Sequence, residues 1–295
     1  MSIASLIVLT IKTSIVLSVF AIGLRATHRD ATYFFRNPAK LASALLSMSV
    51  VMPLFAVLLA GVFNLHPAVK IALVALSVSP IPPLLPKKQL KAGGTESYAI
   101  GLLVAIGLLA IVFVPLALEL VERLFAIPLS VSPGEVLLLV LMTVLAPLGT
   151  GIAVHTVAPS FADKIARPVG LVSLVMLSVS VLPILFTSFP AVTSLIGNGS
   201  ILAFVAFVVV GLAVGHLLGG PDAEDRPVLA LSTASRHPGV AVAIAHANFP
   251  EQKLAMAAVL LYLLVSMIVS IPYLKWATGK VAAPSDTADV PQAHA

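Results

Sequence analysis

The segment that decides the fold is RPVLALSTASRHPGVAVAIAHANFPEQK, residues 226–253. Its flanks are apolar, as in a helix that crosses a membrane, but its middle gathers polar and helix-breaking residues: Ser232, Thr233, Ser235, Arg236, His237, Pro238 and Gly239. An arginine at mid-membrane depth costs about 2.5 kcal/mol or more, and the proline and glycine interrupt the helix. Such a segment is tolerated only where protein or water surrounds it. It therefore predicts a site within the membrane.

The composition places the remaining chain in a membrane as well. Of the 295 residues, 59% are hydrophobic and only 10% are charged, and the mean hydropathy is +1.11. The net charge of +5 does not indicate nucleic-acid binding, because the basic residues lie in short loops between apolar runs, as cytoplasmic loops do. The chain has no cysteine, which excludes disulfides, thiolate catalysis and cysteine-bound metals.

Nine apolar spans follow one another, each close to the length of about 20 residues that a bilayer requires. We expect them at about 4–24, 41–63, 69–86, 98–118, 136–157, 169–186, 201–218, 226–253 and 255–276. Like the eighth, the third is a broken helix, because it runs into four prolines, Pro80, Pro82, Pro83 and Pro86. We expect a water-facing loop with Lys87, Lys88 and Lys91, a short turn with Asp163, Lys164 and Arg167, an uncharged loop at 188–200, and a disordered tail at 281–295.

Most lysines and arginines fall on one side of this arrangement. With the N-terminus outside, the cytoplasmic side receives twelve of them and the exterior only Lys70, Arg123 and Lys253. The excess of positive charge in cytoplasmic loops therefore predicts a multi-pass protein of the cell (inner) membrane, with its N-terminus outside and its C-terminus in the cytoplasm.

The two broken spans predict an internal symmetry. Pro80 and Pro238 are 238 − 80 = 158 residues apart, and Pro115 and Pro272, in the helices that follow, are 272 − 115 = 157 apart. Inverted repeats with discontinuous helices place a binding site near the bilayer midplane. We expect one transporter domain over 1–280, with a first repeat at about 4–120, a connector helix at 136–157 and a second repeat at about 165–276.

The motif LALSTASRHPGVAVAIA, residues 229–245, resembles the second broken helix of the bile acid:sodium symporters and their bacterial relatives, which reads close to ALETGMQNSGLAVALA. The proline-rich SPIPPLLPKK shares a proline and its position with the family's CPGGTASN. The resemblance extends from Leu41 to Trp276 and implies an all-α membrane protein of two inverted repeats with two crossing broken helices, in the nine-span version.

The resemblance also shows where this chain departs from the family. The family's sodium-binding glutamate falls on Ser232, its glutamine on Arg236 and the next asparagine on His237. The serine–asparagine pair of the first crossover falls on Leu85 and Pro86. Because a fixed guanidinium repels a cation that needs oxygen ligands, we do not expect sodium coupling of the family's kind; coupling would be to protons or absent.

The residues of the eighth span admit two interpretations each. Arg236 would anchor an anionic substrate or replace the coupling sodium, and otherwise neutralises backbone carbonyls where the helix breaks. His237 would carry a proton or donate to an anion, or cap the break. We expect both as charged anchors of a substrate site that has Ser232, Thr233 and Ser235 as its polar lining and also includes Gly239.

Other candidates lie outside this span. Lys12, inside the first span, would be a counter-charge or a gate, or would extend to the outer surface. The prolines Pro80, Pro82, Pro83, Pro86 and Pro238 would supply crossover backbone. Because no Asp or Glu lies inside a predicted span, apart from Glu251 near the end of the eighth, the site suits an anionic ligand.

We therefore expect a secondary transporter that moves a small organic anion by alternating access. No catalytic or ATP-binding motif is present, and we expect no enzyme activity, no cofactor and no metal. Two alternatives stay open: a non-transporting sensor or assembly subunit on the same fold, or a related exporter. The substrate, its direction and the oligomeric state do not follow from the sequence.

Overall fold

The computed structural model describes residues 3–125 and 132–282, and every regular element among them is helical. The elements are α1 (Ile3–Gly23), α2 (His28–Ala31), η1 (Tyr33–Arg36), α3 (Pro38–Leu45), η2 (Leu46–Val51), α4 (Met52–Val62), α5 (Pro67–Val78), α6 (Leu85–Lys91), α7 (Glu96–Phe125), α8 (Pro133–Val140), η3 (Leu141–Leu145), α9 (Ala146–Val157), α10 (Pro159–Ser194), α11 (Ser200–Leu218), α12 (Asp225–Ala234), α13 (Pro238–Asn248) and α14 (Ala255–Ala282). Of the three short η elements, η1 is a 3₁₀ turn, whereas η2 and η3 are π-helical turns inside longer helices.

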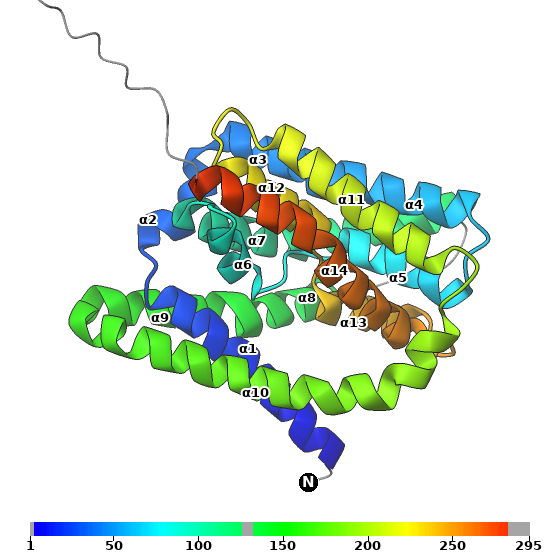
Figure 1. The fold of residues 1–295 in the computed structure, drawn as a ribbon, viewed down its shortest axis with the longest axis horizontal. Coiled ribbons are helices and arrows are strands. Elements are labelled where there is room, and N and C mark those ends of the chain that lie inside the picture. Colours follow the sequence, from blue (N-terminus) through cyan, green and yellow to red (C-terminus); the bar gives the residue numbers. More distant parts are fainter. Residues whose placement is uncertain (1–2, 126–131, 283–295) are drawn as a thin grey trace, which may run out of the picture.

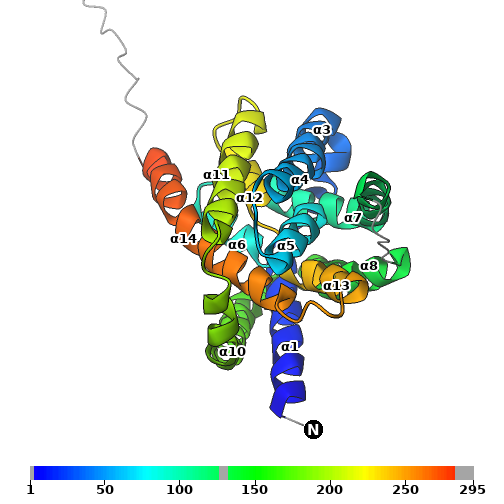
Figure 2. The same ribbon diagram turned by 90° about the vertical axis from the view of Figure 1, so that its right-hand side faces the viewer.

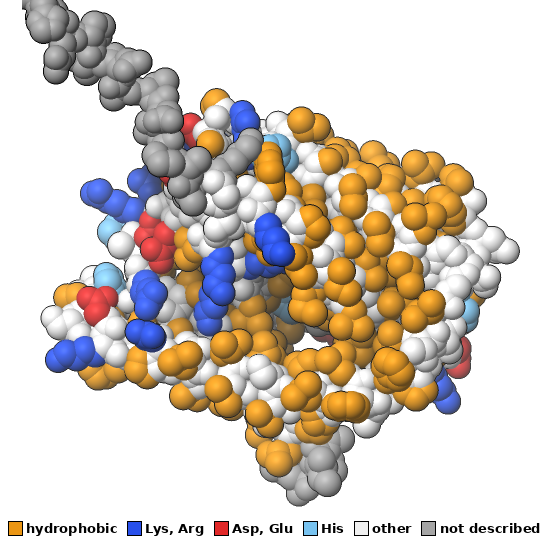
Figure 3. Space-filling model, in the orientation of Figure 1, with side chains coloured by type: hydrophobic (Ala, Val, Ile, Leu, Met, Phe, Trp, Pro, Cys, Tyr) orange, Lys and Arg blue, Asp and Glu red, His pale blue; other side chains and the backbone are white. Residues whose placement is uncertain are grey.

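The all-α membrane fold predicted from the sequence is confirmed. Within the described ranges, eight helical stretches are long and apolar enough to cross a membrane, and α5 is a shorter apolar helix. Large apolar side chains such as Leu54, Phe186 and Leu217 are more than 60% exposed. A surface of this kind is suited to lipid, and orange apolar side chains cover most of the face in Figure 3.

The helices form two layers (Figures 1 and 2). We call α1, α9 and α10 the panel; α1 and α9 approach closely where Gly23 meets Gly151. We call α3–α7 and α11–α14 the core; it contains the largest cluster of buried apolar side chains. Figure 3 shows a hollow between the two layers, with most of the charged side chains on this face gathered towards one end of the molecule.

Both predicted helix interruptions are present in the core. Helix α5 ends at Val78 and α6 begins at Leu85, and α12 ends at Ala234 and α13 begins at Pro238. Proline stands in the first turn of α5, α6 and α13, where its missing N–H leaves no bond unmade.

Several predicted boundaries are wrong. The charged residues Asp163, Lys164 and Arg167 lie within α10, which continues through most of the predicted uncharged loop to Ser194. The three prolines inside α10 do not end it, as is common for membrane helices. The lysines of the predicted water-facing loop, Lys87, Lys88 and Lys91, are in α6.

The predicted disordered tail also begins too early, because α14 continues to Ala282. The remainder of that predicted tail, 283–295, lies outside the described residues.

A stripe of glycines fixes α11 against α12. Gly211, Gly215 and Gly219 face the backbone of α12, and a Cβ on Gly215 would lie 2.6 Å from the Cα of Ala230. Small residues spaced by four let membrane helices approach closely. The stripe therefore holds the half-helix that carries Ser232 and Thr233.

We predict that Gly215→Ala destabilises the protein, whereas Gly149→Ala does not. The added methyl at Gly215 collides with α12 backbone, and overpacking costs about 1–3 kcal/mol. At Gly149 in α9 nothing lies within 4 Å, and alanine favours the helix by about 0.5–1 kcal/mol. Thermal unfolding in detergent compares the two; equal midpoints would contradict close packing of α11 on α12.

Candidate functional site

The two helix breaks meet inside the core. The backbone N–H of His237 donates to the carbonyl of Pro80 over 2.9 Å, which joins the two connections directly. The C-terminal ends of α5 and α12 therefore come together with the N-terminal end of α13. Helix C-termini carry partial negative charge and N-termini partial positive charge, so the meeting point attracts cations on one side and anions on the other.

Arg236 lies at this meeting point and is only 2% exposed. Its Nη1 donates to the carbonyl of Ser79, just after α5, over 3.3 Å, and its Nη2 donates to the carbonyl of Met48 over 2.9 Å. Met48 belongs to the π-helical turn η2, and such a turn interrupts the regular α-helical hydrogen-bond pattern. Among the described residues Arg236 forms no ion pair, and its hydrogen bonds go to backbone carbonyls.

His237 caps α13. Its Nδ1 accepts hydrogen bonds from the backbone N–H groups of Gly239 and Val240, at 3.1 and 3.3 Å. An imidazole that accepts at Nδ1 carries its proton on Nε2. This Nε2 is buried, and no hydrogen-bond partner for it lies in the described part of the chain; the same holds for Nε of Arg236.

Gly239 leaves room for this cap, because a Cβ there would lie 3.0 Å from Cε1 of the His237 ring.

The hydroxyl side chains of α12 form hydrogen bonds with residues of neighbouring helices. Ser232 Oγ accepts a 2.6 Å hydrogen bond from Nε2 of Gln89 in α6. Thr233 Oγ1 lies 2.8 Å from the carbonyl of Leu229 and 3.1 Å from Ser47 Oγ. Ser235 is buried in the connection. These side chains connect α12 to α6 and to the π-helical turn.

Two further residues of the site were missed in the sequence. Tyr262 of α14 donates its hydroxyl to the carbonyl of Ala234, the last residue of α12, over 2.6 Å. Gln89 also donates to the carbonyl of Val228, over 3.0 Å. A signal existed for Tyr262, a polar side chain within apolar sequence whose buried hydroxyl requires a partner. Gln89 gave no such signal, because it stands among the lysines of α6.

The other candidates are placed differently. Pro80, Pro82 and Pro83 lie in the first connection, whereas Pro86 is in the first turn of α6 rather than in the crossover backbone. Lys12 is exposed and lines an open groove on α1 with Ser5, Val8 and Leu9. The structure therefore does not bring Lys12 together with the crossing.

The crossing itself is closed in this conformation. The cavity beside Arg236, between α5 and α7, has a volume of about 10 Å³ and is lined among others by Ser49, Ser79 and Phe113. That is room for about one water molecule. An organic anion must therefore reach the site after the helices move.

Lys87 connects the core to the panel. From α6 it donates to Ser18 Oγ of α1 over 2.7 Å, and a Cβ on Gly170 of α10 would lie 3.8 Å from its Nζ. Burial, followed by the nearby charge of Arg25, lowers the pKa of Lys87, and burial lowers that of Lys88. Neither lysine forms an ion pair within the described residues. The orientation pattern of the sequence did not reveal this position between the layers.

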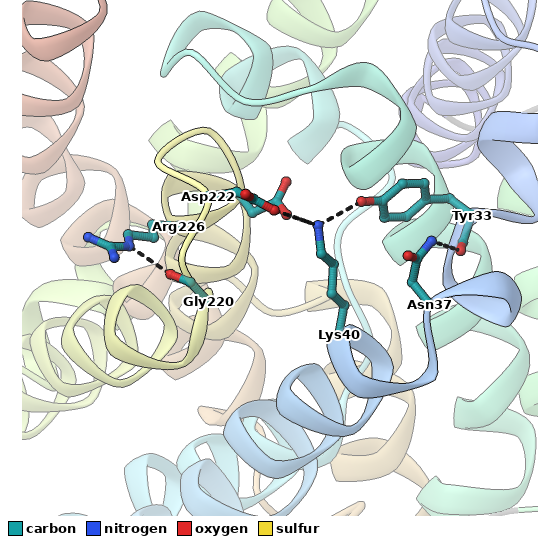
Figure 4. Close-up of polar contacts among 7 residues, drawn as sticks. Tyr33, Asn37, Lys40, Gly220, Asp222 and Arg226 are labelled. Carbon is teal, nitrogen blue, oxygen red and sulfur yellow. Dashed lines mark hydrogen bonds and ion pairs between the residues drawn. The ribbon is translucent and has the colours of Figure 1, made fainter.

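A second polar cluster holds the charged end of the core (Figure 4). Lys40 Nζ lies 2.9 Å from Asp222, 2.5 Å from Asp225 and 2.9 Å from the hydroxyl of Tyr33. The hydrogen bond from Lys40 lowers the pKa of Asp222. Asp225 is buried and begins α12, at the end where a helix favours negative charge. Asp225 directly precedes the predicted eighth span and is the first residue of the observed span Asp225–Asn248.

We predict that Arg236→Met lowers the free energy of unfolding by about 3 kcal/mol. The change leaves the carbonyls of Ser79 and Met48 without their donors, and a hydrogen bond to a charged group contributes about 1.5–3 kcal/mol. The matched control is Arg123→Met, whose exposed ion pair with Glu119 contributes about 0–1 kcal/mol. Chemical denaturation in detergent measures both; losses of equal size would contradict a structural role of the guanidinium.

Comparison with known proteins adds one finding. A model of the Sodium Bile acid symporter family matches residues 13–195, from α1 into the end of α10. This match contains the first helix break, the second half of α1 and the panel helices α9 and α10, and it ends before the segment 229–245 on which the sequence resemblance was based. No curated protein matches the chain.

Proposed function

Because this chain belongs to the sodium bile acid symporter family and is a membrane transporter of that type, we propose that it moves a small organic anion by alternating access without a coupling sodium ion. The observation that carries the proposal is the position of Arg236. Its guanidinium lies among backbone carbonyls at the point where the broken helices meet.

Arg236 acts as a tethered cation in this proposal. In transporters with broken helices, unwound carbonyls and half-helix C-termini coordinate the coupling ion. Here the carbonyls of Ser79 and Met48 already accept from Arg236. A sodium ion brought to the same carbonyls would be repelled by the fixed charge. The side chain thus neutralises the partial negative charge of these carbonyls permanently, whereas a dissociable ion would do so only when bound.

The substrate is an anion for reasons of charge. Half-helix N-termini face anionic substrate groups in transporters of this kind, and α13 begins at the crossing with His237 as its cap. The buried Nε2 of His237 has a donor to offer. Lys87 and Lys88 add two cations near the boundary between core and panel, and within the described residues no acid neutralises either.

The panel and the core are the two bodies that move. They form separate layers (Figure 1), and the hydrogen bond from Lys87 to Ser18 crosses between them. An anion that binds Lys87 would compete with Ser18 for the ammonium group and so weaken the hydrogen bond between core and panel. Substrate binding would then favour the movement that opens the crossing. If an ion is coupled, it is the proton, with His237 as its carrier.

We also propose that the protein lies in the cell (inner) membrane with its N-terminus outside. The charged residues gathered at one end in Figure 3 support a cytoplasmic position of that end.

The proposal predicts uptake that is independent of sodium. Purified protein is reconstituted in proteoliposomes with Na⁺ or K⁺ as the only alkali cation, and uptake of radiolabelled mono- and dicarboxylates and sulfonates is measured from pH 5 to 8. We expect at least one anion to enter at the same rate in both salts, because Arg236 replaces the ion. Uptake that requires sodium would contradict the proposal.

We predict that Lys87→Met lowers uptake of that anion at least tenfold, because the variant removes a cation between the layers. Lys91→Met is the matched control, since Lys91 is on the same helix and exposed. Initial rates are compared after both variants are shown to unfold at the wild-type temperature. Equal uptake rates for the two variants would contradict a role of Lys87 in binding the substrate.

The alternative functions give other results. A sensor or assembly subunit on this fold would bind anions, seen as a rise in unfolding temperature, yet carry none of them across the liposome membrane. A related exporter would carry its substrate outward and show efflux from preloaded liposomes.

A further inference from the structure

Two cavities outside the crossing share three aromatic residues. A shallow groove of about 880 Å³ lies on the outer face of α11 and α14, and a pocket of about 280 Å³ lies at the charged end of the same helices. His216, Tyr273 and Trp276 line both cavities. The ring of His216 makes T-shaped contacts with Tyr273 and Trp276, which are tilted against each other; the centroids are 5.2–5.8 Å apart, and His216 Nδ1 is 2.8 Å from the Tyr273 hydroxyl.

The groove has the dimensions and chemistry of a hydrocarbon-chain site. Apart from the shared rings, its lining is aliphatic, with Leu217 and Ile268 more than 60% exposed. It runs along membrane-spanning helices, and it ends at Trp276 and Tyr273. Such aromatic rings lie at the level of lipid headgroups in membrane proteins.

The pocket beyond the rings carries one charge of each sign. Arg226 and Glu224, both at the start of α12, line it together with Trp276. The Nε of Arg226 donates to the carbonyl of Gly220 over 2.8 Å. Figure 4 shows the remainder of this guanidinium directed away from Lys40 and its carboxylates. Within the described residues neither Arg226 nor Glu224 forms an ion pair.

We propose that this composite cavity binds one phosphatidylethanolamine molecule from the bilayer. Its acyl chain occupies the groove between α11 and α14. Its phosphate accepts from Arg226, because a guanidinium binds phosphate bidentately. Its ammonium group faces the carboxylate of Glu224 and the ring of Trp276, since cations are attracted to tryptophan faces. A headgroup of two opposite charges matches a pocket of two opposite charges.

The site adjoins the half-helix that leads to the crossing. Arg226 and Pro227 are in the first turn of α12, and Ala92, also in the lining, directly follows α6. A bound headgroup would therefore hold the start of α12 against the end of α6, close to where Gln89 of α6 donates to Val228 and Ser232 of α12. Lipid binding here stabilises the crossing from outside.

The test is native mass spectrometry of the purified full-length protein, titrated with phosphatidylethanolamine, phosphatidylglycerol or phosphatidylcholine. We expect one phosphatidylethanolamine to be retained at least fivefold more tightly than either other lipid. Arg226→Met should weaken its binding at least fivefold. Glu224→Gln should remove the preference over phosphatidylglycerol. Ala213→Trp, which fills the groove at an exposed position, should weaken all three lipids.

Each variant has a matched control elsewhere on the surface: Arg123→Met, Glu251→Gln and Ala153→Trp, all at exposed positions. Thermal unfolding establishes that the variants are folded before binding is compared. The proposal is overturned if phosphatidylglycerol or phosphatidylcholine binds as tightly as phosphatidylethanolamine to the unchanged protein. It is also overturned if Arg226→Met and Ala213→Trp bind the lipid as well as their controls do.

Discussion

The structure depends on one problem of electrostatics: two membrane helices stop halfway across, and their carbonyl ends face each other. An unsatisfied carbonyl in a lipid environment costs several kcal/mol, and the dipoles of α5 and α12 add negative partial charge at the same place. Three donors satisfy carbonyls at this place. Arg236 donates to the carbonyl that follows α5, Tyr262 donates to the carbonyl at the end of α12, and the backbone N–H of His237 donates to the carbonyl of Pro80. The other helices of the core are arranged so that these donors reach their acceptors.

The main features of this arrangement could be predicted from the sequence. An arginine, a histidine and a proline within an apolar segment have no stable place against lipid, so residues 232–239 had to be an interior break. The prolines after Val78 ended the third helix for a similar reason, since they remove donors. The resemblance to a known symporter family was correct, and the nine spans correspond to eight long helical stretches and α5.

The parts that were not predicted depend on contacts distant in sequence. The sequence LSMSVV does not indicate that the carbonyl of Met48 is free to accept a hydrogen bond from Arg236, because a π-helical turn has no simple residue signature. Lys87 was predicted to face water because lysines in loops usually mark the cytoplasmic side of a membrane protein. That pattern does not distinguish a lysine in bulk water from one between two layers of helices. The charges at 163–167 resembled a turn but tolerate a helix as well. The glycines 211, 215 and 219, by contrast, recur in the sequence at a spacing of four, although no helix contact was predicted from them.

A cation that is part of the carrier has a consequence for the electrical work of transport. A dissociable ion enters with the substrate and adds its charge to every turnover. In the proposed cycle Arg236 would move with the core in both directions, so over a full cycle it would contribute nothing to the net current. The charge carried is then that of the cargo and of any proton that accompanies it. An unaccompanied monoanion changes its electrical energy by about 2.3 kcal/mol for each 100 mV across the membrane. With the cell interior negative, that energy favours outward movement, and the guanidinium would have changed the direction in which the membrane potential drives the cycle.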